Sequence, residues 1–202
     1  MKNKLFIYIL YAISLGIISG APYVNGIDAF FNSDLSKYTE LRVGVVANHT
    51  SIDSDGISLV DLANDHLNLR AIFTPEHGLF GKDEAGKKIK DRAFNGIPVY
   101  SLYGKNKKPT ADQLKDIDIL LFDMQDIGSR YYTYISTMTY VMQAAVENQV
   151  KLIVLDRPNP IGRSVEGPLL KNGFQSFVGM HPIPIRHGLT IGELAMMIEE
   201  MN

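Results

Sequence analysis

The loop Thr74-Pro-Glu-His-Gly-Leu-Phe-Gly81 contains Glu76, the residue best suited by type and setting to acid catalysis. The two glycines of the loop allow sharp backbone turns around the carboxyl group. Apolar residues flank it, and a carboxylic acid in partly apolar surroundings is suited to general acid catalysis. Capping of a following helix, or pairing with Lys82, explains a glutamate at this position equally well.

The segment Asp123-Met-Gln-Asp-Ile-Gly-Ser-Arg-Tyr-Tyr-Thr-Tyr134 offers groups that bind a polar, ring-shaped ligand. Arg130 could hold a carboxylate through two hydrogen bonds. Tyr132 and Tyr134 could stack on a flat apolar surface such as a sugar ring. A simple ion pair between Asp126 and Arg130, four residues apart on a helix, is the structural alternative.

Two further segments carry charged groups near prolines or glycines. In Asp156-Arg-Pro-Asn-Pro160 the prolines fix φ, so the loop is rigid and could position Asp156, Arg157 and Asn159 toward a ligand. A stiff turn in which Asp156 caps a loop is the alternative. Glu166, in Val165-Glu-Gly-Pro168, is a second carboxylate to consider for acid–base chemistry.

The elements that must position these residues are apolar runs of strand length alternating with helical patterns. The runs are Leu41–Ala47, Leu69–Phe73, Ile97–Leu102, Ile117–Phe122 and Lys151–Leu155. Several are apolar at consecutive positions, as strands buried on both faces require. Helical periodicity covers 58–66 and 135–148. The alternation predicts an α/β fold with a mainly parallel sheet covered by helices on both faces.

The placement of the polar segments is the main sequence evidence for an enzyme. Ligands of open α/β sheets bind at the carboxyl ends of the strands. Four of the predicted strands are followed directly by polar segments, and Asn48 and His49 follow the first. We therefore expect these side chains to gather at one edge of the sheet.

Several function classes lack their usual sequence signals. The five histidines have no zinc-binding spacing, although a metal-dependent hydrolase using His49, His77 and Asp123 stays an alternative. There is no glycine-rich dinucleotide or phosphate loop and no serine-hydrolase elbow, so no cofactor is expected. The formal net charge of −2, with no clustered basic face, does not suggest nucleic acid as a partner.

The N-terminus has the pattern of a secretory signal peptide, which we predict to cover residues 1–26. Met1-Lys-Asn-Lys4 is basic, Leu5–Ile18 is apolar, and small residues follow. We expect an exported, periplasmic or extracellular protein without a stable membrane anchor after cleavage. An uncleaved N-terminal anchor is the alternative. The sequence has no cysteine, so no disulfide supports the domain predicted over 27–202.

Five motifs in one order resemble the exo-β-N-acetylmuramidase family, glycoside hydrolase family 171, formerly a domain-of-unknown-function family. They are TPEHGLFG at 74–81, DMQDIGSRYYTY at 123–134, LDRPNP at 155–160, VEGP at 165–168 and HGLTIGELA at 187–195. The resemblance implies a Rossmann-like three-layer domain, followed in family members by a smaller C-terminal domain that completes the active-site cleft. A helix that starts with a capping box at Thr190 and runs to the end of the chain leads us to expect continuation beyond Asn202.

The same resemblance implies release of N-acetylmuramic acid from the non-reducing ends of peptidoglycan fragments, so muramyl saccharides are the expected partners. Glycoside hydrolysis usually needs two carboxylates. Glu76 is the predicted acid, and Glu166 or Asp126 is its partner. Arg130 or Arg157 could bind the lactyl carboxylate. The predicted substrate-binding residues are Asn48, His49, His77, Arg130, Tyr132, Tyr134, Asp156, Arg157 and Asn159. A domain that binds muramyl ligands without cleaving them is the second hypothesis.

Overall fold

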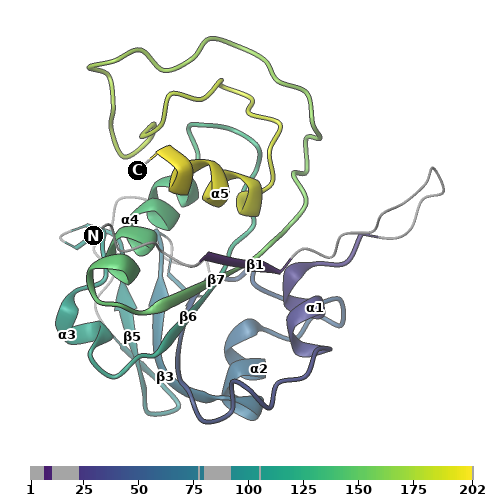
Figure 1. Cartoon of the computed structure of the whole chain (residues 1–202), viewed down its shortest axis with the longest axis vertical. Coiled ribbons are helices and arrows are strands. Elements are labelled where there is room, and N and C mark those ends of the chain that lie inside the picture. Colours follow the sequence, from purple (N-terminus) through teal and green to yellow (C-terminus); the bar gives the residue numbers. More distant parts are fainter. Residues whose placement is uncertain (1–6, 11–22, 77, 80–91, 105, 202) are drawn as a thin grey trace.

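The computed structural model describes residues 7–10, 23–76, 78–79, 92–104 and 106–201. These residues form a seven-stranded sheet with helices on both faces (Figure 1). In chain order the elements are β1 (Ile7–Leu10), α1 (Gly26–Phe31), β2 (Arg42–Ala47), α2 (Leu59–His66), β3 (Asn68–Thr74), β4 (Arg92–Phe94), β5 (Ile97–Ser101), α3 (Ala111–Leu114), β6 (Ile119–Asp123), α4 (Tyr134–Glu147), β7 (Lys151–Leu155) and α5 (Ile191–Met201). The predicted α/β class with a mainly parallel sheet is confirmed.

The strand order is β1-β7-β6-β2-β3-β5-β4, and every neighbouring pair is parallel except β4 with β5. At the centre, β2 pairs with β6 on one side, with Ala47 opposite Asp123, and with β3 on the other. Because parallel strands end at the same edge, the segments after β2, β3, β5, β6 and β7 meet there. This edge carries most of the predicted site residues.

The sheet separates two hydrophobic cores because neighbouring side chains of a strand point to opposite faces. In β2, Val46 belongs to the core shared with α4 and α5, whereas Val45 belongs to the core shared with α1 and α2. Both side chains are fully buried. Since burial of a Val, Leu, Ile or Phe side chain is worth about 1.5–3 kcal/mol, both layers contribute strongly to stability.

Side-chain caps fix the starts of α2 and α5. Ser58 Oγ accepts a hydrogen bond from the Asp61 amide at 3.1 Å at the start of α2. Before α5, the Glu193 carboxylate accepts from the Thr190 amide at 2.9 Å, and Thr190 Oγ1 accepts from the Glu193 amide at 3.2 Å. The predicted capping box is thus confirmed, and it orients α5 so that its apolar face packs on the sheet.

The five predicted strands and both interior helices are present, with ends shifted by at most two residues. Sequence patterns did not indicate α1, α3 or β4, which are three to six residues long. β1 lies inside the apolar run predicted as a signal peptide and pairs with β7. Processing of residues 1–26 stays a prediction. Within the described residues, none of the helices has the length and apolarity needed to cross a membrane.

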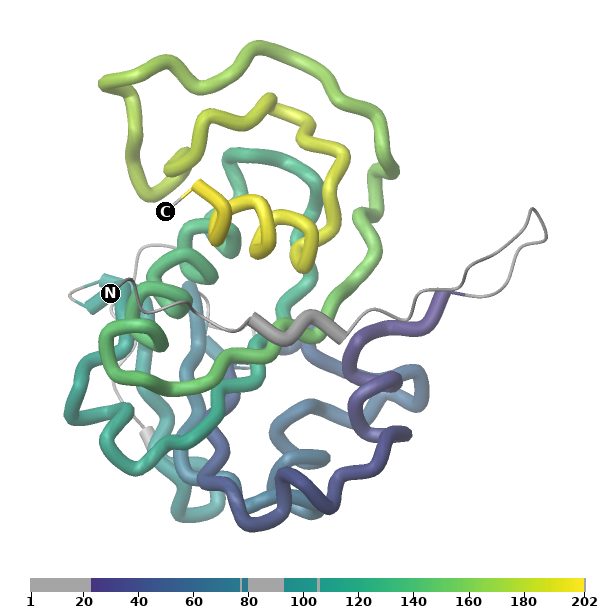
Figure 2. Tube along the Cα trace, in the orientation of Figure 1, coloured from purple at the N-terminus to yellow at the C-terminus, as the bar shows by residue number. Residues whose placement is uncertain are grey.

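Residues 156–190 form a long connection without helix or strand, which extends beyond α5 (Figure 2). Side chains from the body of the fold hold it. Arg130 Nη1 donates to the carbonyl oxygens of Pro168 and Ile183, at 2.8 and 2.5 Å. Thr139 Oγ1 lies 2.7 Å from His181 Nε2. The connection carries three of the five motifs, in whole or in part, so these contacts place them near the sheet edge.

Candidate active site

Glu76 lies in a turn directly after β3, half-buried. The turn is closed by a hydrogen bond from the Gly78 amide to the Pro75 carbonyl at 3.2 Å, and Gly78 has a positive φ of 72°. The Glu76 carboxylate forms a hydrogen bond with the Tyr103 hydroxyl, which raises the pKa of Tyr103 because the bond favours the protonated phenol. Glu76 therefore has a phenol as its neighbour, supplied by the loop after β5.

Two further tyrosines and an amide complete the surroundings of Glu76. Burial raises the pKa of Tyr134, with contributions from the hydrogen bond to Tyr132 and from the charge of Glu76. Asn48 Nδ2 donates to the Tyr134 hydroxyl at 2.6 Å. Loops after β2, β3 and β5 and the start of α4 thus meet in one cluster, which we call the Glu76 cluster: Asn48, Glu76, Tyr103, Tyr132 and Tyr134.

The loops after β2 and β6 are tied together beside this cluster. Asn48 Oδ1 accepts from the amide and the hydroxyl of Thr50, at 2.8 and 2.6 Å. The Gln125 amide in turn donates to Thr50 Oγ1 at 3.0 Å. Asn48 is only 3% exposed. Both the nitrogen and the oxygen of its side-chain amide bind other residues of the protein. These hydrogen bonds do not support the predicted contact of Asn48 with substrate.

Asp123 and Arg157 form a buried ion pair at the ends of β6 and β7. Arg157 Nε and Nη2 donate to the two oxygens of Asp123 at 2.5 and 2.8 Å. Asp123 is fully buried and Arg157 is 6% exposed. Arg157 Nη2 also donates to the Ile52 carbonyl at 2.7 Å. These contacts give Arg157 a structural role in place of the predicted grip on a lactyl carboxylate, and they occupy the oxygens that a metal would need.

Asp156 and Asn159 likewise bind the protein itself. Asp156 Oδ1 accepts from the amides of Arg157 and Gly192 at 2.9 and 2.8 Å, and Oδ2 accepts from the Thr190 hydroxyl at 2.9 Å. The carboxylate therefore has a structural role, as the alternative expected, but it caps the start of the helix α5 and not a loop. Asn159 Nδ2 donates to the Leu189 carbonyl at 3.0 Å. Their predicted roles in substrate binding are not supported by these contacts.

Asp126 forms a buried pair with His187. Its Oδ2 accepts from the Gly128 amide at 2.7 Å and lies 3.1 Å from His187 Nε2. The alternative of an Asp126–Arg130 helix pair is wrong, because residues 126–130 are not helical and Arg130 binds carbonyl oxygens of residues 156–190. Arg130 is only 7% exposed, and its hydrogen bonds to Pro168 and Ile183 position residues 156–190.

The remaining predicted residues differ in accessibility. The Glu166 side chain is 63% exposed and pairs with Arg186 at 2.6 Å, across an isolated antiparallel bridge. His49 is exposed and lines a cavity of about 300 Å³ at the carboxyl end of β2, together with Leu79 and residues near the start of α2. His77 lies outside the described residues. The described residues contain no group of three or more His, Asp or Glu side chains that could hold a metal ion.

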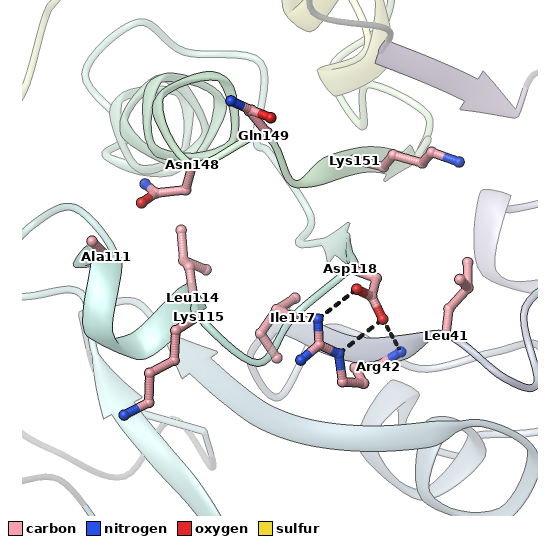
Figure 3. A pocket seen from close by; sticks show the side chains of 10 residues that line it. All are labelled: Leu41, Arg42, Ala111, Leu114, Lys115, Ile117, Asp118, Asn148, Gln149 and Lys151. Atoms are coloured by element: carbon pink, nitrogen blue, oxygen red, sulfur yellow. Dashed lines mark hydrogen bonds and ion pairs between the residues drawn. The ribbon is translucent and has the colours of Figure 1, made fainter.

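A larger cavity of about 620 Å³ lies at the opposite, amino end of the sheet (Figure 3). It is lined in part by Arg42 at the start of β2 and Lys151 at the start of β7. Arg42 donates to both Asp118 oxygens at 2.7 and 3.0 Å, and this hydrogen bonding lowers the pKa of Asp118 to about 2. We place the site at the carboxyl edge despite the greater volume here, because that edge gathers the buried polar groups.

Tyr103 and His187 are site residues that our sequence analysis did not single out. Tyr103 follows β5, whose polar trailing segment Gly104-Lys-Asn-Lys-Lys108 was not among the four segments considered for the site. His187 opens the motif HGLTIGELA, which was used only as part of the resemblance. Listing every titratable residue within three positions of a predicted strand end would have found Tyr103. The partner of His187, 61 residues away, has no local sequence signal.

Comparison with known proteins identifies related sequences. A family model described as exo-β-N-acetylmuramidase NamZ, N-terminal, matches residues 43–202. The peptidoglycan β-N-acetylmuramidase NamZ of Bacillus subtilis strain 168 is 47% identical over 182 residues, which cover 87% of this chain and 44% of the relative.

Two solved structures of DUF1343 family proteins from Bacteroides fragilis NCTC 9343 are also similar. Their TM-scores are 0.79 and 0.70, at 46% and 37% sequence identity. Each match covers 87% of this chain, and 45% and 46% of those chains. The chain thus spans less than half the length of these relatives.

Proposed function

Because this chain belongs to the family of the exo-β-N-acetylmuramidase NamZ, whose N-terminal part it matches, we propose that it acts in the release of N-acetylmuramic acid from the non-reducing ends of peptidoglycan fragments. The observation that carries the proposal is the Glu76 cluster. It brings a half-buried carboxyl group, three phenols and an amide to the edge where α/β folds bind ligands.

In this reaction Glu76 is the general acid. Its proton passes to the glycosidic oxygen as the bond between that oxygen and the anomeric carbon breaks, and the oxygen keeps the electron pair. Tyr103, hydrogen-bonded to Glu76, orients the carboxyl group. A second carboxylate acts on the other reactant, either on water or on the anomeric carbon, and Asp126 and Glu166 are the two candidates.

Aromatic groups near Glu76 suit a sugar ring. The Tyr132 and Tyr134 rings pack with their centroids 4.5 Å apart, and Tyr131 is 56% exposed. A partly exposed tyrosine face offers a stacking surface for the apolar side of a pyranose. Arg130 and Arg157 act in this scheme by holding the loops, since Arg130 Nη1 and Arg157 Nε donate to protein oxygens.

Export forms part of the proposal. Peptidoglycan lies outside the cytoplasm, so a muramidase that acts on it in place has to leave the cell. The basic start and apolar run over residues 1–18 are what a secretory signal requires. N-terminal sequencing of the secreted protein tests this part of the proposal, and an intact Met1 on exported material would contradict cleavage.

Hydrolysis is tested with a chromogenic β-N-acetylmuramide. We expect the protein to release the chromophore and Glu76→Gln to reduce turnover at least 1000-fold, with an unchanged melting temperature, because the amide cannot donate an acidic proton. Lys82→Gln is the matched control for the alternative in which Glu76 serves an ion pair. Turnover by Glu76→Gln within tenfold of wild type would refute the role of Glu76.

A binding domain without cleavage is the second candidate, favoured by the coverage of only 44% of the Bacillus relative. In that case residues supplied by the rest of such a protein would complete catalysis. Calorimetric titration of the 202-residue chain with N-acetylmuramic acid, run beside the hydrolysis assay, separates the two. Heat of binding without product release favours the binding domain, and product release excludes it.

A further inference from the structure

Three buried aspartates, Asp123, Asp126 and Asp156, lie at or just after the ends of β6 and β7, and their bonding differs. Both oxygens of Asp123 accept from Arg157, and both oxygens of Asp156 accept from donors at the start of α5. Only one oxygen of Asp126 is so engaged, by the Gly128 amide and His187. The first two carboxylates are therefore saturated structural groups, and the third has an open acceptor.

The open atom of Asp126 is Oδ1, which is buried and has no hydrogen-bond partner among the described residues. Leaving a buried acceptor unpaired destabilises the folded protein, and more so when the group is charged. Native structures rarely contain such atoms, and those present call for a functional explanation. Among the three buried aspartates only Asp126 has an unpaired oxygen; the other unpaired buried side-chain atoms of the described residues are Thr74 Oγ1, Arg130 Nε and Arg186 Nε, none of which is a carboxylate.

His187 holds Asp126 in one orientation. Its Nδ1 accepts a hydrogen bond from the Leu189 amide at 3.2 Å, so the ring proton resides on Nε2 and points to Asp126 Oδ2. The His187 side chain is fully buried, and the His187 backbone amide donates to the Gly128 carbonyl at 3.3 Å. A fixed tautomer that donates to one oxygen keeps the other oxygen pointing away from the histidine.

Hydrogen bonds connect Asp126 with the Glu76 cluster. The amide of Gln125, which precedes Asp126 in the chain, donates to Thr50 Oγ1, and the Thr50 hydroxyl donates to Asn48 Oδ1. Asn48 donates to the Tyr134 hydroxyl, and the charge of Glu76 contributes to the raised pKa of Tyr134. The backbone at Asp126 is therefore held in the same network as the acid. No such link is seen for Glu166, whose bonds among the described residues are to Arg186.

We infer that Asp126 supplies the second carboxylate of the site and that His187 is its positioning residue. The inference rests on the proposed function. In glycoside hydrolysis this carboxylate either bonds to the anomeric carbon or removes a proton from the water that does so, while the leaving oxygen takes the proton of Glu76. Because Oδ1 is buried in the free protein, substrate binding has to displace part of its surroundings, and residues 156–190 are the neighbouring segment without helix or strand.

The inference is tested by binding and turnover in the same set of variants. N-acetylmuramic acid is titrated into the 202-residue chain by calorimetry, and hydrolysis of the chromogenic muramide is followed in parallel. Asp126→Asn keeps the shape and the bonds to Gly128 and His187 but replaces Oδ1 with an NH2 donor. We expect at least tenfold weaker binding, at least 100-fold lower turnover if the chain turns over, and no loss of melting temperature. Asp112→Asn, an exposed acid in α3, controls for loss of charge.

Substitution of His187 separates positioning from stability. His187→Gln retains an amide donor that can reach Asp126, whereas His187→Leu has none. We expect the first to keep binding within threefold of wild type and the second to lose it as Asp126→Asn does, at matched melting temperatures. Equal binding by Asp126→Asn and wild type, or a tenfold loss in Glu166→Gln alone, would overturn the inference. If wild type neither binds nor cleaves, the proposed function itself fails.

Discussion

Replacing Arg157 with methionine removes the guanidinium from the buried ion pair with Asp123. It leaves Asp123 fully buried, with neither oxygen bound to the donors that now lie 2.5 and 2.8 Å away. Breaking a buried pair in this way costs about 3–5 kcal/mol. For a domain of this length about 1 kcal/mol changes the melting temperature by about 2–4 °C, so we expect a fall of about 6–20 °C.

The loss should depend on pH in a defined direction. Burial raises the pKa of Asp123 above its ordinary value of 3.8, with Arg157 as the main opposing influence. Without Arg157 that pKa rises further. A group with a raised folded pKa binds its proton more tightly in the folded state, so stability increases as the pH falls through that pKa toward 3.8. The deficit of Arg157→Met should therefore shrink between pH 7 and pH 4.

Thermal and urea unfolding at both pH values measure the deficit, and an exposed pair of similar length is the control. Lys108 Nζ lies 2.7 Å from Glu147, with the two side chains 38% and 57% exposed. Removing such a pair costs about 0–1 kcal/mol, so Lys108→Met should barely change stability. Equal losses in the two variants, or a deficit of Arg157→Met that is the same at pH 4 and pH 7, would refute the argument from burial.

Three other perturbations test particular contacts. Asp118→Asn should lower stability at pH 7, because hydrogen bonding to the Arg42 guanidinium lowers the pKa of Asp118 to about 2. Urea unfolding should show this loss of stability above pH 4, and the loss should disappear as the pH falls through 2. In the uncleaved 202-residue chain, Gly26→Ala places a Cβ 2.2 Å from the backbone nitrogen of Asp156, which caps α5, and should destabilise by about 2 kcal/mol or more. Gly179→Ala, with no contact closer than 3.8 Å, should be close to neutral, and equal melting temperatures would contradict this. Glu76→Gln should lower the pKa of Tyr103 toward 10, because the carboxylate that favours the protonated phenol is gone. NMR titration of ring-labelled tyrosine measures this pKa, and an unchanged value would show that the contact is absent.

The fold was largely predictable because its signal is local. Runs such as Lys151–Leu155 are apolar over a whole strand, and the alternation of such runs with helical periodicity leaves few arrangements other than a parallel sheet. The elements that the sequence did not indicate are short. α3 spans four residues, and β4 is a three-residue edge strand, so neither is long enough to establish a period.

The site was predictable in position more than in role. The expectation that the segments after the strands gather at one edge of the sheet correctly placed Asn48, Glu76 and Asp126. What the sequence could not show was which polar groups bind one another, because Asp123 meets Arg157 across 34 residues and Asp156 meets Gly192 across 36. A charged residue in a rigid loop looks the same whether it faces a ligand or a partner in the chain. His77 and Gly81 lie outside the described residues and stay untested.

The central position of β2 affects how the chain has to be made. Ala47 at its end pairs with Asp123, so one side of β2 has no partner until about 75 more residues have left the ribosome, roughly 4–15 s at usual synthesis rates. During that interval β2, which contains the apolar residues Val43, Val45 and Val46, can pair only with β3. A growing chain with an apolar strand edge exposed for seconds is a good substrate for chaperones and, if exported, a chain that stays unfolded long enough to be threaded through a membrane pore.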